Sequence, residues 1–223
     1  MKKLITLIKN EFFPPPKESA FEMMERLERE AEERYERRPD DDTTIEIIIV
    51  SDNHGDTWYL EQLRRFHKKA DYFVHCGDSN LKPDHPELAN MTVVKGNTDY
   101  TLPYQDDEFV TVANDEKLMI THGHRFLVGY GRQKLIDYAK NLPTPPNIVL
   151  YGHTHIVEVD MLDDVLIINP GSISDPRDET PPSYAKLTIM EENYQVKLYR
   201  AADNVVIKEW LFLRSTRHLC QNP

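Results

Sequence analysis

Residues Ile148-Val149-Leu150-Tyr151-Gly152-His153-Thr154-His155 join a short apolar run to two histidines that stand one residue apart. The apolar run predicts a buried strand, and the glycine predicts a tight turn at its end. On an extended segment, the alternation of side chains would point both imidazoles to the same side. Because a neutral imidazole is the commonest metal ligand near neutral pH, this pair is a candidate metal-binding element.

Four other apolar runs also end in polar residues that can hold a metal ion. The segments that follow them are Ser51-Asp52-Asn53-His54-Gly55-Asp56, His75-Cys76-Gly77-Asp78, Lys95-Gly96-Asn97-Thr98-Asp99 and Thr121-His122-Gly123-His124. In α/β proteins, ligands gather at the carboxyl ends of strands, where loops converge. Five of the 8 glycines stand beside a candidate ligand, and glycine permits sharp turns and a close approach of the backbone. The candidate metal ligands are Asp52, His54, Asp78, Asn97, His122, His153 and His155.

This set of nitrogen and oxygen donors is larger than one tetrahedral zinc ion requires. It suits two divalent cations about 3.5–4 Å apart that share a carboxylate, as in two-metal hydrolases. Mn²⁺, Fe²⁺, Ni²⁺ and Zn²⁺ all accept such donors, and we expect Mn²⁺.

The composition of the chain restricts its partners. The 223 residues suit one domain with attachments. The formal net charge of −11 argues against nucleic acid as a partner. No apolar run approaches the roughly 20 residues that span a membrane. The 2 cysteines lie far apart in the sequence, which predicts a reducing cytoplasm.

Helix and strand patterns alternate at first and then give way to hairpins. Ile45–Val50 predicts a strand buried on both faces, and Leu60–Ala70 predicts the helix after it. The other predicted strands are Tyr72–Val74, Met91–Val94, Phe109–Ala113, Lys117–Ile120, Val157–Met161, Val165–Ile168, Tyr184–Met190, Gln195–Tyr199 and Val205–Leu213, and the other helix is Gln133–Asn141. We expect hairpins around Asn114-Asp115 and Asp163-Asp164. The order predicts α/β layers with a mixed sheet.

The chain divides into three parts. Residues 45–213 carry all the motifs and form the predicted domain. Residues 1–44 predict a charged amphipathic helical extension, which would pack on the domain, form a homodimer or dock a partner. Residues 214–223 form a predicted tail.

The motif series resembles that of calcineurin-like metallophosphoesterases, and in particular the small prokaryotic phosphodiesterases of that superfamily. The matching motifs are Asp52-x-His54, Gly77-Asp78, Gly96-Asn97, His122-Gly123 and Gly152-His153-x-His155, in that order. The resemblance covers residues 45–199 and beyond, and it implies a four-layer α/β/β/α sandwich of two mixed sheets. It also implies that Asp78 bridges two metal ions and that a bridging water attacks the phosphorus of a small phosphodiester. By position, the first ion would be held by Asp52, His54 and His155, and the second by Asn97, His122 and His153.

One position departs from the family pattern. Many relatives have a histidine directly after the asparagine, as an acid for the leaving oxygen, where this chain has Thr98. A threonine hydroxyl cannot act as an acid near pH 7, so we expect a preference for good leaving groups. The candidate catalytic residues are Asn97, Thr98, Asp99 and His124. Asp99 would orient Thr98 or a water, or else be a turn residue; His124 would bond a ligand or substrate, or else cap its loop.

Several interpretations stay open at this stage. Arg125 and Arg177 could clamp a phosphate, although surface placement is the simpler expectation for both. A phosphomonoesterase acting on nucleotides or phosphoproteins is the alternative within enzymes, and Thr98 counts against it. A non-enzymatic scaffold of the same fold, like the related retromer subunit, would predict lost ligands, and none of the seven is missing.

Overall fold

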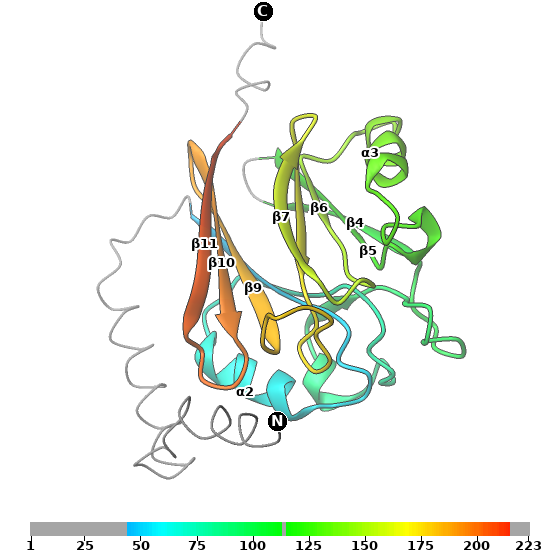
Figure 1. Cartoon of the computed structure of the whole chain (residues 1–223), viewed down its shortest axis with the longest axis vertical. Coiled ribbons are helices and arrows are strands. Elements are labelled where there is room, and N and C mark those ends of the chain that lie inside the picture. Colours follow the sequence, from blue (N-terminus) through cyan, green and yellow to red (C-terminus); the bar gives the residue numbers. More distant parts are fainter. Residues whose placement is uncertain (1–43, 113–114, 215–223) are drawn as a thin grey trace, which may run out of the picture. The chain divides into compact units, whose positions relative to one another are not determined.

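The computed structural model describes residues 44–112 and 115–214 (Figure 1). The predicted N-terminal extension, its homodimer contact, and all of the predicted tail beyond Arg214 lie outside the described residues. So do positions 113–114, the last residue of one predicted strand and the first residue of the hairpin turn predicted after it.

One sheet has six strands in the order β11-β10-β9-β1-β2-β3. Its strands are β1 (Ile45–Val50), β2 (Tyr72–His75), β3 (Met91–Val93), β9 (Ser183–Ile189), β10 (Asn193–Arg200) and β11 (Val206–Leu213). The first three strands run parallel, and β9 pairs antiparallel with β1, with Ile47 opposite Leu187. This sheet is therefore mixed.

The second sheet has five strands in the order β4-β5-β6-β8-β7. Its strands are β4 (Asp107–Val112), β5 (Glu116–Thr121), β6 (Ile148–Leu150), β7 (Val157–Leu162) and β8 (Val165–Pro170). Strands β5, β6 and β8 are parallel, while β4 and β7 pair antiparallel at the two edges. Asp163 and Asp164 join β7 to β8 with φ angles of 50° and 66°. Two residues with positive φ form the turn that suits the twist of a two-residue hairpin, as their sequence predicted.

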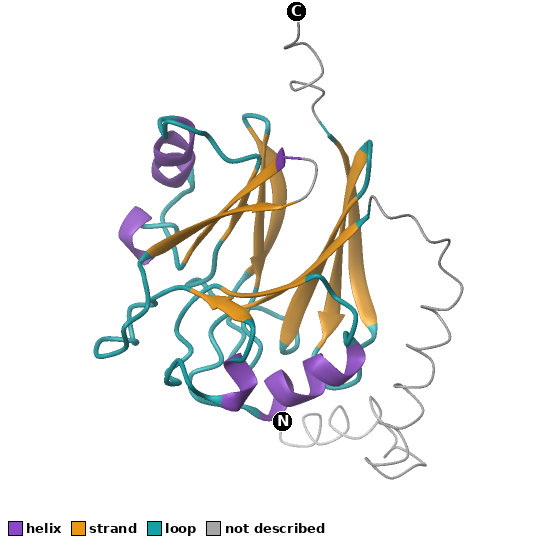
Figure 2. Cartoon of the chain, turned by 180° about the vertical axis from the view of Figure 1, so that it is seen from behind, coloured by secondary structure: helices purple, strands orange, loops and turns teal. Residues whose placement is uncertain are grey.

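The two sheets pack face to face, and a helix covers the outer face of each. Alternation along β1 sends Ile47 and Ile49 into the core between the sheets and Ile48 toward α2 (Trp58–Phe66). The other helix, α3 (Gln133–Lys140), buries Leu135 on the outer face of the five-stranded sheet. Figure 2 shows the two groups of strands facing each other. The predicted α/β/β/α sandwich of two mixed sheets is confirmed.

Short helical turns and helix ends account for most differences from the sequence prediction. Two 3₁₀ turns, η1 (Pro86–Leu88) and η3 (His124–Phe126), were not predicted. The helix predicted to end at Ala70 ends at Phe66, because His67 leaves helical geometry and its Nε2 lies 2.7 Å from the Tyr184 hydroxyl. Within the described ranges, no helix is both long and apolar enough to cross a bilayer.

Candidate metal centre

The predicted ligands follow the carboxyl ends of strands in both sheets. Asp52 follows β1, Asp78 follows β2 and Asn97 lies beyond β3, all in the six-stranded sheet. His122 follows β5 and His153 follows β6, in the five-stranded sheet. Because parallel strands end at the same edge of a sheet, these loops meet at one rim of the sandwich.

The backbone at these positions is left-handed. Five of the predicted ligands have positive φ: Asp52 at 56°, His54 at 46°, Asp78 at 54°, His153 at 71° and His155 at 59°. A positive φ is costly for a non-glycine residue and clusters at functional sites. The expectation that an extended backbone points both histidines of the pair to one side is therefore wrong. The chain turns at each histidine, so the two imidazoles reach different neighbours.

The first group of candidate ligands is Asp52, His54 and His155, whose ligand atoms all lie within 4.8 Å of one another. The Nε2 atom of His155 lies 3.2 Å from Oδ1 of Asp52 and 3.2 Å from Nε2 of His54. Two imidazole nitrogens at this separation do not attract unless a proton or a cation lies between them. A divalent cation satisfies both of them together with the carboxylate.

The second group is Asp52, Asp78 and His122. The Nε2 atom of His122 lies 3.4 Å from Oδ2 of Asp78 and 3.0 Å from Oδ1 of Asn97. The ring of His153 lies 5.2 Å from that of His122. Asp52 is common to both groups, whereas the bridging role predicted for Asp78 stays a prediction. All seven predicted ligands lie in one region of the rim.

Backbone carbonyl groups set the orientation of two imidazoles. Nδ1 of His122 donates to the carbonyl oxygen of Cys76 at 2.8 Å, and Nδ1 of His155 donates to that of Asp175 at 2.5 Å. A carbonyl oxygen can only accept, so Nδ1 carries the hydrogen and Nε2 of each neutral ring offers its lone pair to the site. Metal-binding histidines are held in the same way. These contacts could not be predicted from the residue types, since every residue has a carbonyl group.

The residues present fit a divalent metal centre. Oδ1 of Asp52 is buried and, among the described residues, has no hydrogen-bond partner of normal geometry. Its other oxygen accepts a hydrogen bond from the Ser51 hydroxyl at 2.5 Å and another from the His153 N–H at 3.1 Å. A carboxylate held on one side and left open on the other is poised to bind a cation.

Two glycines make room for these carboxylates. A Cβ atom on Gly96 would lie 2.0 Å from Oδ1 of Asp78, and one on Gly152 would lie 1.9 Å from Oγ of Ser51. At both positions the backbone therefore approaches the site more closely than it could at a residue with a Cβ atom.

The electrostatics of the site keep both carboxylates ionised. Burial alone would raise the pKa of Asp52, but His155 and His122 outweigh it, so that the pKa lies below its usual range. Burial also opposes ionisation of Asp78, but the His122 imidazole and the Thr98 N–H lower its pKa. Burial lowers the pKa of His75 to about 4. The imidazole of His75 is therefore neutral, and its Nε2 lies 2.8 Å from Oδ1 of Asn53, the residue after Asp52.

A model of the calcineurin-like phosphoesterase superfamily domain matches residues 45–192. The chain belongs to this superfamily. A probable metallophosphoesterase of Bacillus subtilis, YsnB, is 36% identical over 163 residues, which cover 73% of this chain and 95% of the relative. The crystal structure of a conserved uncharacterized protein of Streptococcus pneumoniae, a predicted phosphoesterase, is 34% identical with a TM-score of 0.71, covering 77% of this chain and 98% of that one. Vacuolar protein sorting 29 of Cryptosporidium parvum, at 18% identity and a TM-score of 0.63, shares the fold, with 78% of this chain and 99% of that one covered.

Membership of the metallophosphoesterase superfamily implies divalent metal ions, and the two ligand groups are where this chain would hold them. The remaining candidate catalytic residues lie around these groups. The Thr98 N–H donates to Oδ1 of Asp78 at 2.7 Å, and its hydroxyl accepts from the Asn80 side chain at 2.9 Å. In this metallophosphoesterase, Thr98 therefore positions a carboxylate.

Asp99 and His124 differ in how they relate to the site. Asp99 is fully buried, and its carboxylate accepts backbone N–H groups of Ser79, Asn80 and Gly96. This geometry fits the turn interpretation. His124 packs 5.4 Å from the His122 ring and 6.1 Å from the His153 ring, and its Nδ1 is buried without a hydrogen-bond partner among the described residues. A ligand role or a substrate contact for His124 stays a prediction.

Proposed function

We propose that this metallophosphoesterase is a phosphodiesterase that hydrolyses a small phosphodiester with the help of two divalent cations. The observation that carries the proposal is the convergence of Nε2 atoms from His54, His122 and His155 on two ionised carboxylates, Asp52 and Asp78. When bound, two such cations lower the pKa of a water molecule and neutralise charge on phosphoryl oxygens.

The residues of the chain hold this arrangement in place. His54, Asp52 and His155 would bind one cation; Asn97, His122 and His153 would bind the other; and Asp78 would stand between them. The N–H groups of Thr98 and His153 fix the two carboxylates by direct hydrogen bonds. Such supporting contacts keep catalytic groups within a fraction of an ångström of a productive position.

The threonine after Asn97 favours a preference for diesters with good leaving groups over unactivated monoesters. Thr98 uses its hydroxyl to accept a hydrogen bond from Asn80, and a threonine hydroxyl does not supply a proton near neutral pH. The phosphomonoesterase alternative would need another acid, for which His124 is the candidate. A non-enzymatic scaffold of this fold remains a separate proposal; it is not favoured by a site with every predicted ligand in place.

The test compares hydrolysis of bis-p-nitrophenyl phosphate with that of p-nitrophenyl phosphate. The protein is stripped with a chelator and then given Mn²⁺, Fe²⁺, Ni²⁺ or Zn²⁺ in separate samples. His153→Ala serves as the site variant, and His85→Ala serves as a control because His85 lies at η1, where it accepts from the Glu87 N–H. Metal-dependent cleavage of the diester that is lost only in His153→Ala supports the proposal.

Other outcomes would overturn it. Faster cleavage of the monoester would favour the phosphomonoesterase. Absence of turnover with all four metals would favour the scaffold. Loss of turnover in both His153→Ala and His85→Ala would mean that the loss is not specific to the metal site, and it would count against the proposal. The metal that restores the highest kcat/KM identifies the preferred cofactor, which we expect to be Mn²⁺.

A further inference from the structure

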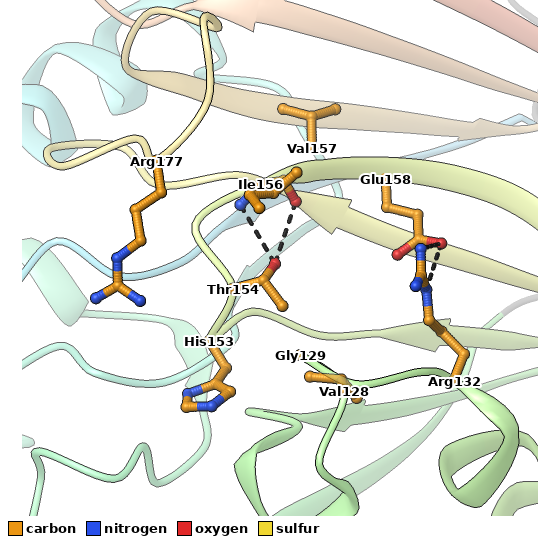
Figure 3. Close-up of a pocket in the computed structure, with 9 residues that line it drawn as sticks. All are labelled: Val128, Gly129, Arg132, His153, Thr154, Ile156, Val157, Glu158 and Arg177. Carbon is orange, nitrogen blue, oxygen red and sulfur yellow. Dashed lines mark hydrogen bonds and ion pairs between the residues drawn. The ribbon is translucent and has the colours of Figure 1, made fainter.

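A cavity of about 320 Å³ lies next to His153. Figure 3 shows Val128 on one side of it and Val157 on the other. His153 and Arg177 lie toward one end, and an ion pair between Arg132 and Glu158 lies toward the opposite end. The volume falls at the lower limit of about 300–1,000 Å³ for ligand pockets. It suits one compact substituent of a phosphodiester.

The ion pair toward the far end of the cavity has no charge left to attract a ligand. Glu158 accepts hydrogen bonds from Arg132 and from the Tyr151 hydroxyl, one on each carboxylate oxygen. The positive and negative charges therefore cancel within the wall. The net charge of the lining residues comes from Arg177.

Arg177 differs from every other arginine in the part of the chain that the structure describes. Its guanidinium has no hydrogen-bond or ion-pair partner among the described residues, although the chain has 38 acidic residues against 27 basic ones. The others bond a carboxylate or a backbone carbonyl: Arg64, Arg65, Arg125, Arg132, Arg200 and Arg214. Asp178, next in sequence, uses Oδ1 to accept the Thr180 N–H. An arginine kept free of carboxylates is available to an external anion.

The backbone of Arg177 is fixed to the metal site. Its N–H donates to the carbonyl oxygen of His155 at 3.1 Å, and the carbonyl of Asp175 in the same loop accepts from Nδ1 of His155. These two bonds hold the loop against a predicted metal ligand. The backbone from which the Arg177 side chain extends is therefore held beside the metal site.

We propose that Arg177 binds a second anionic group of the substrate, so that the enzyme selects small phosphodiesters in which one alcohol carries a carboxylate or a further phosphate. That alcohol enters the cavity at the end where His153 and Arg177 lie, so that its anionic group can reach the guanidinium. The inference rests on the proposed phosphodiesterase function and names its substrate class. Arg177 thus acts as a specificity-determining residue.

The test uses three p-nitrophenyl phosphodiesters that share one leaving group. Their second alcohols are 3-hydroxypropanoate, propanol and choline, so the substituent is anionic, neutral or cationic. We expect wild-type kcat/KM to fall in that order, because the leaving group is constant and only the contact with Arg177 differs. In Arg177→Gln, the ratio of the anionic to the neutral probe should fall about tenfold, the scale expected for loss of one hydrogen bond between charged groups. Arg177→Lys should retain part of the ratio.

Arg125→Gln is the matched control. Arg125 is also exposed and lies in η3 near the site, but Asp106 and Asp107 neutralise it at 2.9 and 3.6 Å. The ratio of kcat/KM for the anionic probe to that for the neutral probe should be the same in Arg125→Gln as in the wild type. Equal losses on all three probes in Arg177→Gln would overturn the inference, because they would place Arg177 on the scissile phosphate or in the loop structure alone.

Failure of the proposed function is read separately. If the wild type hydrolyses none of the probes with any metal, the phosphodiesterase proposal fails. Calorimetry with the Mn²⁺-loaded protein then compares binding of 3-phosphooxypropanoate with that of propyl phosphate. Tighter binding of the first that is lost in Arg177→Gln supports the anion site, and equal binding overturns it.

Discussion

Replacement of Gly96 by alanine should disable the metal centre without removing a single ligand. The added Cβ would lie 2.0 Å from Oδ1 and 2.2 Å from N of Asp78, whereas ordinary contact begins at 3.4 Å. The carboxylate or the loop must therefore move by about 1.4 Å, the difference between 3.4 and 2.0 Å. Neither moves freely, since Asp78 is bonded to the Thr98 N–H and Gly96 to Asp99.

A misplacement of about 1 Å in a catalytic constellation can cost about 100-fold in rate. We expect hydrolysis of bis-p-nitrophenyl phosphate by Gly96→Ala to fall at least that far at saturating Mn²⁺. The assay is paired with metal analysis of the purified protein and with circular dichroism to confirm the fold. Gly129→Ala is the control for metal content, because nothing lies within 4 Å of a Cβ placed there. A folded Gly96→Ala protein that keeps more than a tenth of the activity would refute the reasoning.

Three further predictions concern stability. Burial lowers the pKa of His67 to about 3, so below pH 6.5 the unfolded chain binds a proton that the folded protein refuses. The free energy of unfolding, measured in urea on the chelated protein, should fall by up to about 1.4 kcal/mol per pH unit as the pH falls from 6.5 to 5. His67→Gln should remove that part of the pH dependence, and an unchanged pH dependence would contradict the prediction. Arg214→Met leaves the buried Glu116 carboxylate with the Tyr194 hydroxyl as its remaining partner, and it should lower the free energy of unfolding by roughly 3 kcal/mol. Arg65→Met, which removes an exposed ion pair, should lower it by less than about 1 kcal/mol. Equal losses would contradict the role given to burial. Mn²⁺ at a hundred times its Kd should raise the free energy of unfolding by about 2.7 kcal/mol, measured by calorimetry and reversed by chelator, and an unshifted transition would mean that the folded state does not bind the metal.

The sequence predicted the strands well because β-branched runs such as Ile45–Val50 leave few other choices. It also placed every candidate ligand in a loop that follows a strand. It missed the left-handed backbone at Asp52 and His54, because aspartate and histidine are found at both signs of φ and neither position follows a recognisable hairpin pattern. The early end of α2 was also hidden, since His67 leaves the helix to contact Tyr184, 117 positions away.

The candidate centre draws on both halves of the sandwich. Asp52 and His54 follow a strand of the six-stranded sheet, and His155 follows a strand of the five-stranded sheet, yet all three meet in one ligand group. A cation bound there would link the two sheets, so part of its binding free energy would also stabilise the packing of one sheet on the other. Changes that loosen the apolar contact between the sheets should therefore weaken metal affinity from a distance. Neither sheet alone could hold the ion.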